Sequence, residues 1–317
     1  MEILNFSDIL NQENKITNNI SKLLKDKTTK KNIVWATESY QSYGEEYEKN
    51  KQMTAYSTIK LIRNGIMLPR IMKSKEQQDK RTQKKAEVYT PSWVCNKMNN
   101  YCDEQWFNRK NVFNVENDDN TWTTSTEKIE FDNDKKKNWK KYVDSRRIEI
   151  TCGEAPYIVS RYDATTGEKL NINDRIGILD RKLRIVNENT ESENEWLKWT
   201  YRAFESVYGF EFQGDSLFFA RLNMIQTFID YYNDRFSKDP TKKMLERITN
   251  IVSWNIWQMD GLKDTIPYNS LDEMYEQISL NNFFSNKNEE NNSVKYCKIK
   301  DWRANKTMEY RKMKGDY

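Results

Sequence analysis

Three segments in the second half of the chain constrain its fold more than any other feature of the sequence. They are RIEITCGEAPYIV from Arg147, VYGFEFQGDSLFFARLNMIQTFI from Val207 and ITNIVSWNIWQMDGL from Ile248. Each begins with a short β-rich segment, and the first two then turn at a glycine and enter a helix-periodic apolar segment. Strand, turn and helix in alternation predict an α/β domain with a mainly parallel sheet.

The rest of the chain has a more helical or irregular pattern. Residues 1–86 carry one apolar helical stripe near the N-terminus and a second over QMTAYSTIKLIRNGIM. Between the first two α/β segments, NDRIGILDRKLRIVNEN and NEWLKWTYRAFESV predict two helices, an insertion at about 165–206. Polar residues at 107–145 predict exposed connections with a loop or short hairpin, and VKYCKIKDW predicts a late strand. We therefore expect a helical N-terminal region, 1–86, and an α/β domain, 87–317.

The composition excludes several kinds of catalytic site. None of the 317 residues is histidine, which removes Ser-His-Asp and Cys-His nucleophile systems, His-containing zinc sites and the two-His iron triad. The four cysteines form no CxxC pair, so neither a zinc knuckle nor a thioredoxin-type motif is present. There is also no GxGxxG and no P-loop motif. We expect no metal cofactor, and chemistry that uses phosphate or methyl donors, carboxylates or none at all.

Basic residues gather in the N-terminal region. Residues 1–86 hold 17 Lys and Arg against 10 Asp and Glu, whereas the remaining residues hold 35 against 38. Seven bases lie between residues 70 and 85, and such a density can release counterions from a phosphate backbone. The alternative is a solvated charged face. As a group, the candidate nucleic-acid contacts are Arg70, Lys73, Lys75, Lys80, Arg81, Lys84 and Lys85.

Polar residues follow each predicted strand at the edge where a doubly wound sheet binds its ligand. Gly153 follows the first strand, where it lets a ligand approach the backbone closely. Glu211 ends the second strand, and an acid there can accept hydrogen bonds from ribose hydroxyls. Asp260 lies beside a glycine after the third strand. Each could be an ordinary strand-end turn, but the ordered series predicts a nucleotide-like ligand.

The series resembles a known family, the N6-adenine DNA methyltransferases of bacterial restriction–modification systems in their gamma motif order. As a whole, the sequence also resembles chains called restriction endonuclease subunit M. The family elements fyTPxxvaxxm, DPACGSG, GxDIDPxAxxLARxNL and NIxxGDsL are matched, over roughly residues 86–262, by EVYTPSWVCNKM, EITCGEA, GFEFQGDSLFFARLN and NIWQMDGL. Four elements in the same order are more specific than any one of them.

The resemblance implies a Rossmann-like sheet that binds S-adenosylmethionine, in a cytoplasmic protein encoded by a bacterium or phage. The residues that it assigns to this ligand are Tyr89, Thr90, Pro91, Glu149, Gly153, Glu211 and Asp260. The first three would flank the methionine end and the next two would line the donor loop. Glu211 would bind the ribose hydroxyls, and Asp260 would accept from the adenine amino group. DNA is the implied partner, with a separate specificity or endonuclease subunit as a further one, and no membrane is implied.

One element of the family is missing. Its members follow the third element with Asn/Asp-Pro-Pro-aromatic, which holds the target amino group and stacks on the flipped base. No two of the five prolines in this chain are adjacent. Asp301 and Trp302, at the end of the late predicted strand, are the candidate substitute for the acceptor and the aromatic residue; the alternative is a surface acid and a packed tryptophan.

Three functions therefore stay open at this point. The first is a S-adenosylmethionine-dependent DNA methyltransferase specific for adenine N6, or its modification subunit. The second is a catalytically inactive methyltransferase-like subunit or regulator that keeps ligand or nucleic-acid binding. The third is an unrelated nucleotide-binding α/β protein, because a fold does not fix a function.

Overall fold

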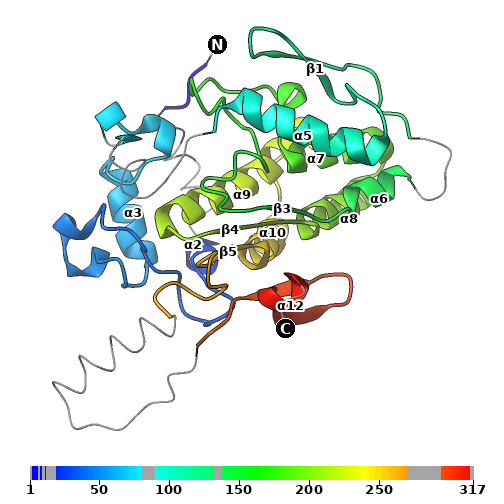
Figure 1. Ribbon diagram of the computed structural model, residues 1–317. Coiled ribbons are helices and arrows are strands. Elements are labelled where there is room, and N and C mark those ends of the chain that lie inside the picture. The colour runs from blue at the N-terminus through cyan, green and yellow to red at the C-terminus, as the bar shows by residue number, and fades with distance from the viewer. Residues whose placement is uncertain are drawn as a thin grey trace, which may run out of the picture.

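A small parallel sheet lies at the centre of the α/β domain (Figure 1). The computed structural model describes residues 2–5, 8, 11, 19–76, 78–79, 90–131, 137–269 and 294–314. Its sheet has the order β3 (Arg147–Glu149), β4 (Val207–Glu211), β5 (Ile256–Gln258), and both strand pairs are parallel. The middle strand, β4, is buried over all of its residues, as is usual for a parallel strand covered on both faces. The predicted α/β class and parallel sheet are confirmed.

Pairs of helices connect the three strands. Helices α7 (Ile178–Asn189) and α8 (Glu193–Glu205) lie between β3 and β4, and α9 (Gly214–Phe236) and α10 (Lys242–Asn255) lie between β4 and β5. The side chain of Ser192 accepts a hydrogen bond at the start of α8, which satisfies one of the free N–H groups of the first turn. The two helices predicted for the insertion are confirmed.

The prediction that a helix directly follows Gly153 is wrong. The next α-helix begins only at Ile178, after a loop that includes the 3-10 turn η5 (Ile172–Asp174). Thr151, Gly153 and Ala155 have positive φ angles of 49°, 51° and 67°, and L-residues in this region cannot continue a right-handed helix.

The third α/β segment begins as helix and not as strand. Residues 248–255 form the end of α10, with Ile248, Ile251 and Val252 buried on one face. That spacing of three and four residues is the period of a helix facing a core. The β-branched composition favoured a strand, but packing against β4 and β5 overrides this preference. Only Ile256–Gln258 forms β5.

Over residues 19–72, the N-terminal region is less helical than predicted. Its elements between residues 19 and 72 include α2 (Ile20–Leu23), η2 (Gln41–Tyr43), η3 (Glu45–Tyr47), α3 (Ala55–Arg63) and η4 (Arg70–Met72). The helix predicted over QMTAYSTIKLIRNGIM is confirmed as α3. Between these elements, residues 24–40, 48–54 and 64–69 run as turns or as irregular and extended backbone. The predicted boundary at 86/87 lies outside the described residues.

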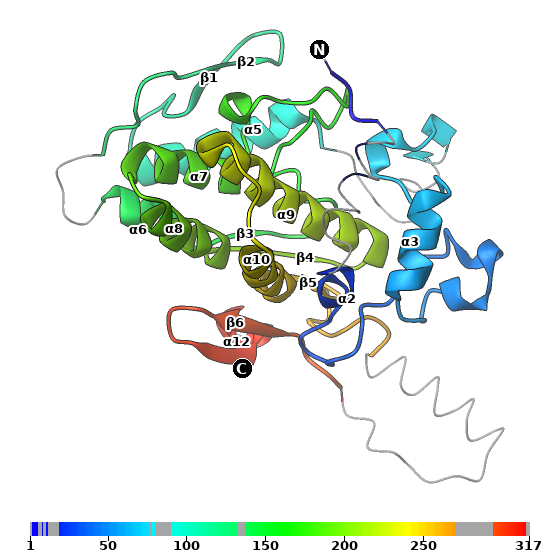
Figure 2. The same cartoon turned by 180° about the vertical axis from the view of Figure 1, so that it is seen from behind.

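Polar contacts join this N-terminal region to the sheet. Val34 exchanges two hydrogen bonds with the side chain of Gln258, at 2.9 and 2.8 Å, at the carboxyl end of β5. Arg221 of α9 is fully buried and donates to the carbonyls of Leu23 and Ile256. Helix α2 lies beside α10 (Figure 2). One apolar cluster contains residues of both regions. The N-terminal region therefore packs against the α/β domain and shares its core.

Helix α5 (Ser92–Phe107) is held by a buried polar network. Asp103 accepts hydrogen bonds from Arg181 of α7 at 2.7 Å and from the Tyr142 hydroxyl at 2.9 Å. Both Asp103 and Arg181 are buried, and Arg181 also donates to the side chains of Asn96 and Asn100 of α5, at 2.8 and 2.7 Å, so charge-assisted bonds fix α5 against α7. After α5 come a hairpin, confirmed as predicted, and a short helix: β1 (Asn114–Glu116), β2 (Trp122–Thr124) and α6 (Trp139–Val143).

The C-terminal hairpin packs on one face of the sheet. It consists of β6 (Lys298–Asp301) and β7 (Lys306–Glu309), which pair antiparallel, and is followed by α12 (Tyr310–Lys314). A second apolar cluster joins Tyr310 to Phe210 and Trp257 of the sheet. The predicted late strand is confirmed as β6, but β6 pairs with β7 and does not extend the parallel sheet. No helix in the described part of the chain has the length and hydropathy needed to cross a bilayer.

Candidate functional site

A cavity of about 1040 Å³ opens at the carboxyl ends of β3, β4 and β5. This is the edge at which parallel α/β sheets bind ligands. Its floor comes from the sheet and the loop after β3, and its walls come from the N-terminal region and the start of α5. Five residues predicted from the sequence as ligand-binding line it: Thr90, Glu149, Gly153, Glu211 and Asp260.

Glu149 is the last residue of β3 and is only 8% exposed. One of its carboxyl oxygens accepts a long hydrogen bond of 3.4 Å from the Tyr157 N–H. The other, Oε2, is buried and has no hydrogen-bond partner. Burial, together with the nearby charge of Glu211, raises the pKa of Glu149 well above its ordinary value. The cavity therefore contains a buried carboxyl group whose second oxygen is not engaged by the protein.

Glu211 connects the ends of β3 and β4. Its carboxylate accepts from the Gly153 N–H at 2.9 Å and from the Gln213 N–H at 3.0 Å. One carboxylate oxygen thus holds the loop after β3 and the other holds the turn after β4. Gly153 has a φ of 51°, and a side chain added there would point into open space. The glycine is thus explained by its backbone conformation, and it leaves the cavity wall clear at this point.

Asp260 closes the turn after β5. Its Oδ1 atom accepts from the N–H groups of Leu262 and Lys263, at 3.0 and 3.2 Å, an arrangement common for aspartate in turns. A Cβ atom at Gly261 would lie 2.7 Å from the Phe210 ring, so only glycine lets this turn pack against β4. Asp260 has a structural role in the turn in addition to its place on the cavity wall.

The element around Thr90 lies at the start of α5. Pro91 is the N-cap residue, with a φ of −58°, and its carbonyl accepts from the Val94 and Cys95 N–H groups. Thr90 lines the cavity, whereas Pro91 fixes where the helix begins. Tyr89 lies outside the described residues.

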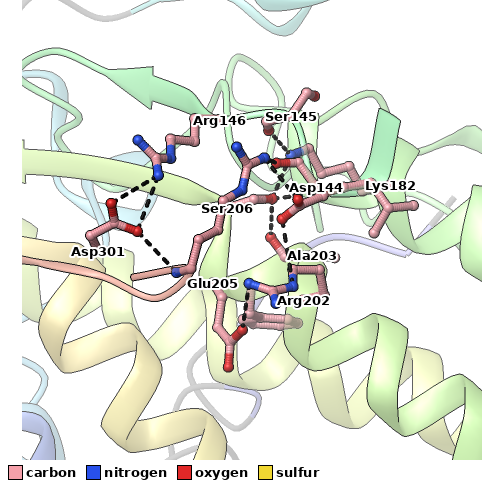
Figure 3. A network of polar contacts seen from close by, with 12 residues as sticks. Asp144, Ser145, Arg146, Lys182, Arg202, Ala203, Glu205, Ser206 and Asp301 are labelled. Atoms are coloured by element: carbon pink, nitrogen blue, oxygen red, sulfur yellow. Dashed lines mark hydrogen bonds and ion pairs between the residues drawn. The ribbon is translucent and has the colours of Figure 1, made fainter. Parts of the chain in front are cut away.

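Asp301 and Trp302 do not line the cavity, and Asp301 lies beside Arg146 (Figure 3). Asp301 accepts two hydrogen bonds, at 3.1 and 3.0 Å, from Arg146, which directly precedes β3. The Trp302 indole N–H donates at 2.7 Å to Asn255, which directly precedes β5. Both partners stand at the amino ends of their strands, while the cavity is at the carboxyl ends. This pair is part of the hairpin's attachment to the sheet.

The charge state of Asp301 agrees with that attachment. Although burial opposes ionisation, N–H donors from Ala304 and Arg303 and the charge of Arg146 hold the pKa of Asp301 below its ordinary value. An acceptor saturated in this way is poorly suited to receive a target amino group. The Trp302 ring is likewise engaged, since the Lys300 ammonium lies 4.3 Å from its centre.

The predicted basic group does not form one exposed face within the described residues. Arg70 is buried and lines the cavity, where its backbone N–H donates at 2.7 Å to the Glu154 carboxylate. The Lys73 side chain is 7% exposed, and its ammonium lies 3.6 Å from the buried Asp215 carboxylate. Lys75 is exposed. The other members, Lys80, Arg81, Lys84 and Lys85, lie outside the described residues.

Sequence reasoning missed the cavity wall that comes from the N-terminal region. Ala36 and Thr37 line the cavity because Trp35 accepts a hydrogen bond from the N–H of Gly214, at the start of α9. It also missed the aromatic pair Phe212 and Tyr268, whose ring centres are 5.8 Å apart on the cavity wall. These contacts are long-range, and no local pattern in the sequence signals them.

The cavity is more acidic than basic. The charged residues that line it are Glu38, Lys49, Arg70, Glu149, Glu154, Arg161, Glu211 and Asp260, five acids against three bases. Cys152, beneath the loop, is buried, and burial together with Glu149 raises the pKa of its thiol well above the ordinary range. A thiol in that state is a poor nucleophile. The site therefore offers acceptors and a protonatable carboxyl for binding, and no activated nucleophile among the residues described above.

Comparisons with protein-family models, with curated proteins and with solved structures find no match for this chain. The site must therefore be interpreted from its own chemistry. A cavity of this volume is large enough for a nucleoside-sized ligand. The carboxylates of Glu211 and Asp260 and the open backbone at Gly153 suit a ligand that carries hydroxyl and amino donors.

Proposed function

We propose that the cavity binds S-adenosylmethionine and that the chain is a methyltransferase-like protein of the adenine-N6 DNA class, either the enzyme or its modification subunit. The observation that carries the proposal is the meeting of Glu149, Glu211 and Asp260 in one cavity, with a buried oxygen of Glu149 left unpartnered. Three consecutive parallel strands joined by helical crossovers also resemble one half of a doubly wound sheet, which supports a Rossmann-like fold.

The proposed roles follow from the donors that the ligand offers. The Glu211 carboxylate accepts from the ribose hydroxyls, and the Asp260 carboxylate accepts from the adenine amino group. Glu149 and the backbone at Gly153 lie toward the methionine end, near Thr90. The ligand itself supplies the reactive methyl group on a positively charged sulfur. The protein contributes binding and orientation, for which no histidine is needed.

The second candidate is a binding subunit or regulator that does not transfer methyl groups by itself. The contacts of Asp301 with Arg146 and of Trp302 with Asn255 favour it, because they engage both side chains at the amino ends of the strands. Catalysis by the first candidate then needs an acceptor for the target amino group other than Asp301. DNA is the proposed partner of both candidates, through the exposed Lys75 and the basic residues predicted to follow it, Lys80, Arg81, Lys84 and Lys85.

Transfer of a labelled methyl group from S-adenosylmethionine to DNA distinguishes the two candidates. The protein is assayed alone and with the products of neighbouring genes, and the Glu211→Ala variant is assayed beside it. Incorporation by the wild type alone, lost in the variant, supports the enzyme. Incorporation only with a partner product supports the subunit. Binding of ATP or a dinucleotide in preference to S-adenosylmethionine would contradict both.

A further inference from the structure

A second cavity, of about 490 Å³, adjoins the first and is lined mainly by α9 and the loop after β3. Arg161 and Tyr162 line both cavities and form the wall between them. On the α9 side, Gln226, Asp230 and Asn233 follow one another at intervals of four and three residues, so they share one face of the helix. This second cavity plays no part in the function proposed above.

Asp230 organises the polar groups of this cavity. Its Oδ2 atom accepts from Arg161 and from Arg175, both at 2.8 Å, and its Oδ1 atom accepts from the Gln226 amide nitrogen at 3.1 Å. Although burial opposes ionisation, the two guanidinium groups hold the pKa of Asp230 below its ordinary value. An ionised carboxylate thus holds Arg175 on one oxygen and Gln226 on the other, which brings these two side chains next to each other.

Each of these two side chains keeps one polar atom without a partner. The Arg175 side chain is 6% exposed and Gln226 is 5% exposed. The Nη1 donor of Arg175 and the Oε1 acceptor of Gln226 are both buried and make no hydrogen bond. Asn233 adds a second unpartnered acceptor, Oδ1, on the same wall. Buried polar groups nearly always have a partner, either in the protein or in a bound molecule, so three such atoms on residues that line one cavity are candidates for ligand contacts.

The unpaired atoms define what that ligand must offer. The Arg175 donor and the Gln226 acceptor are together complementary to a ligand group that has an acceptor next to a donor. A phosphate or carboxylate would accept from Arg175 but would be repelled by the acceptor oxygens of Gln226, Asn233 and Asp230. A cation would be repelled by the positive charge of Arg175. A neutral group that both accepts and donates fits these atoms, and the edge of a nucleobase is such a group, because it carries a ring nitrogen or carbonyl next to an N–H.

We propose that this second cavity binds a nucleobase edge-on, with Arg175 donating to a base acceptor and Gln226 accepting from the adjacent N–H. Apolar side chains of Leu170 and Ile172 line the same cavity and suit the faces of a base. The volume is sufficient for one nucleoside. The same base chemistry is offered by a free nucleoside and by a base in a single-stranded nucleic acid.

Cytidine is the probe of choice, because it has the required acceptor and donor but is not the adenosine that the first cavity is proposed to hold. Binding is measured by ligand-observed NMR on the full chain, up to about 10 mM cytidine. The matched ligand is 2-pyrimidinone riboside, which lacks the 4-amino donor. Two variants remove one free atom each: Arg175→Lys keeps a positive charge near Asp230, and Gln226→Met keeps the side-chain length. Glu211→Ala, in the first cavity, is the control.

We expect saturable cytidine binding by the wild type and by Glu211→Ala, weakened at least about tenfold in either cavity variant and for 2-pyrimidinone riboside. Thermal unfolding of each variant confirms that it is folded. A hexamer of deoxycytidylate is titrated in parallel. Tighter binding of the hexamer, in competition with cytidine, identifies a nucleic-acid base as the source; equal or weaker binding identifies a free nucleoside. Absence of saturable binding of both cytidine and the hexamer would overturn the proposal, and so would binding that both variants leave unchanged. The cavity would then be a water-filled space.

Discussion

Replacing Glu149 by glutamine should increase the free energy of unfolding, and the increase should grow with pH. Burial raises the pKa of this carboxyl well above 4.5, its ordinary value. Between that value and the raised pKa, the folded protein keeps a proton that the unfolded chain has lost. The stability contributed by the protonated carboxyl is therefore fully present below pH 4.5 and is lost as the pH rises through the folded pKa.

The size of the effect follows from this linkage. Each pH unit in that range lowers the stability of the wild type by up to about 1.4 kcal/mol for one proton. Glutamine has the same shape and can still accept from the Tyr157 N–H, but it does not ionise. Other acids with raised pKa values, such as the buried Asp180 and the half-buried Glu205, are present in both proteins, so their contributions cancel in the difference. The groups that face Glu149, namely Glu211, Cys95 and Cys152, are also unchanged.

Urea unfolding of wild type and Glu149→Gln, at several pH values from about 5 to about 8, measures this difference. We expect it to widen with pH in favour of the variant. Glu127→Gln, a change at an exposed acid, is the control and should show a constant, small difference. A wild-type–Glu149→Gln difference that stays constant over this range would show that Glu149 ionises normally in the folded protein, and would refute the reasoning.

Three further predictions concern other parts of the fold. Trp302→Phe leaves the Asn255 acceptor unpaired and should lower the free energy of unfolding by about 1 kcal/mol; S-adenosylmethionine binding, measured by calorimetry, should stay the same, and its loss would place Trp302 in the site. Gly153→Ala forces a side chain into the left-handed region and should lower stability by about 1 kcal/mol, with weaker ligand binding in the same titration. Lys73→Met removes a cation from the buried Asp215 and should destabilise by more than 1 kcal/mol; denaturant midpoints equal to wild type would contradict that ion pair.

The parts of the fold that could be predicted from the sequence are those with a strong local pattern. The strand ending at Glu211 and the two inserted helices have clear periodicity, and the structure has them where the pattern places them. The strand predicted from Ile248 was wrong at its start. The β-branched residues there favour a strand locally, whereas burial of one helical face decides the outcome. The missing helix after Gly153 reflects backbone conformations at Thr151 and Ala155 that no composition signal reveals.

The candidate site was predicted in part for the same reason. Carboxyl ends of parallel strands meet at one edge, so the positions of Glu149, Glu211 and Asp260 follow from the strand assignment. Asp301 has the same local signal, an acid that ends a strand, yet β6 pairs with β7 in a separate hairpin. Which strands pair depends on contacts far apart in the sequence, and the cavity wall from the N-terminal region has the same origin.

Calorimetric titration of the purified protein with S-adenosylmethionine tests the central claim most directly. Glu211→Ala and Glu127→Ala, which each remove one negative charge, are titrated beside the wild type; Glu211 lines the cavity, while Glu127 is exposed on another part of the surface. We predict binding by the wild type and by Glu127→Ala, weakened about tenfold or more in Glu211→Ala, as expected when a charged acceptor is lost. Absence of binding at about millimolar ligand, with and without DNA, or equal affinity in all three proteins, would contradict the account.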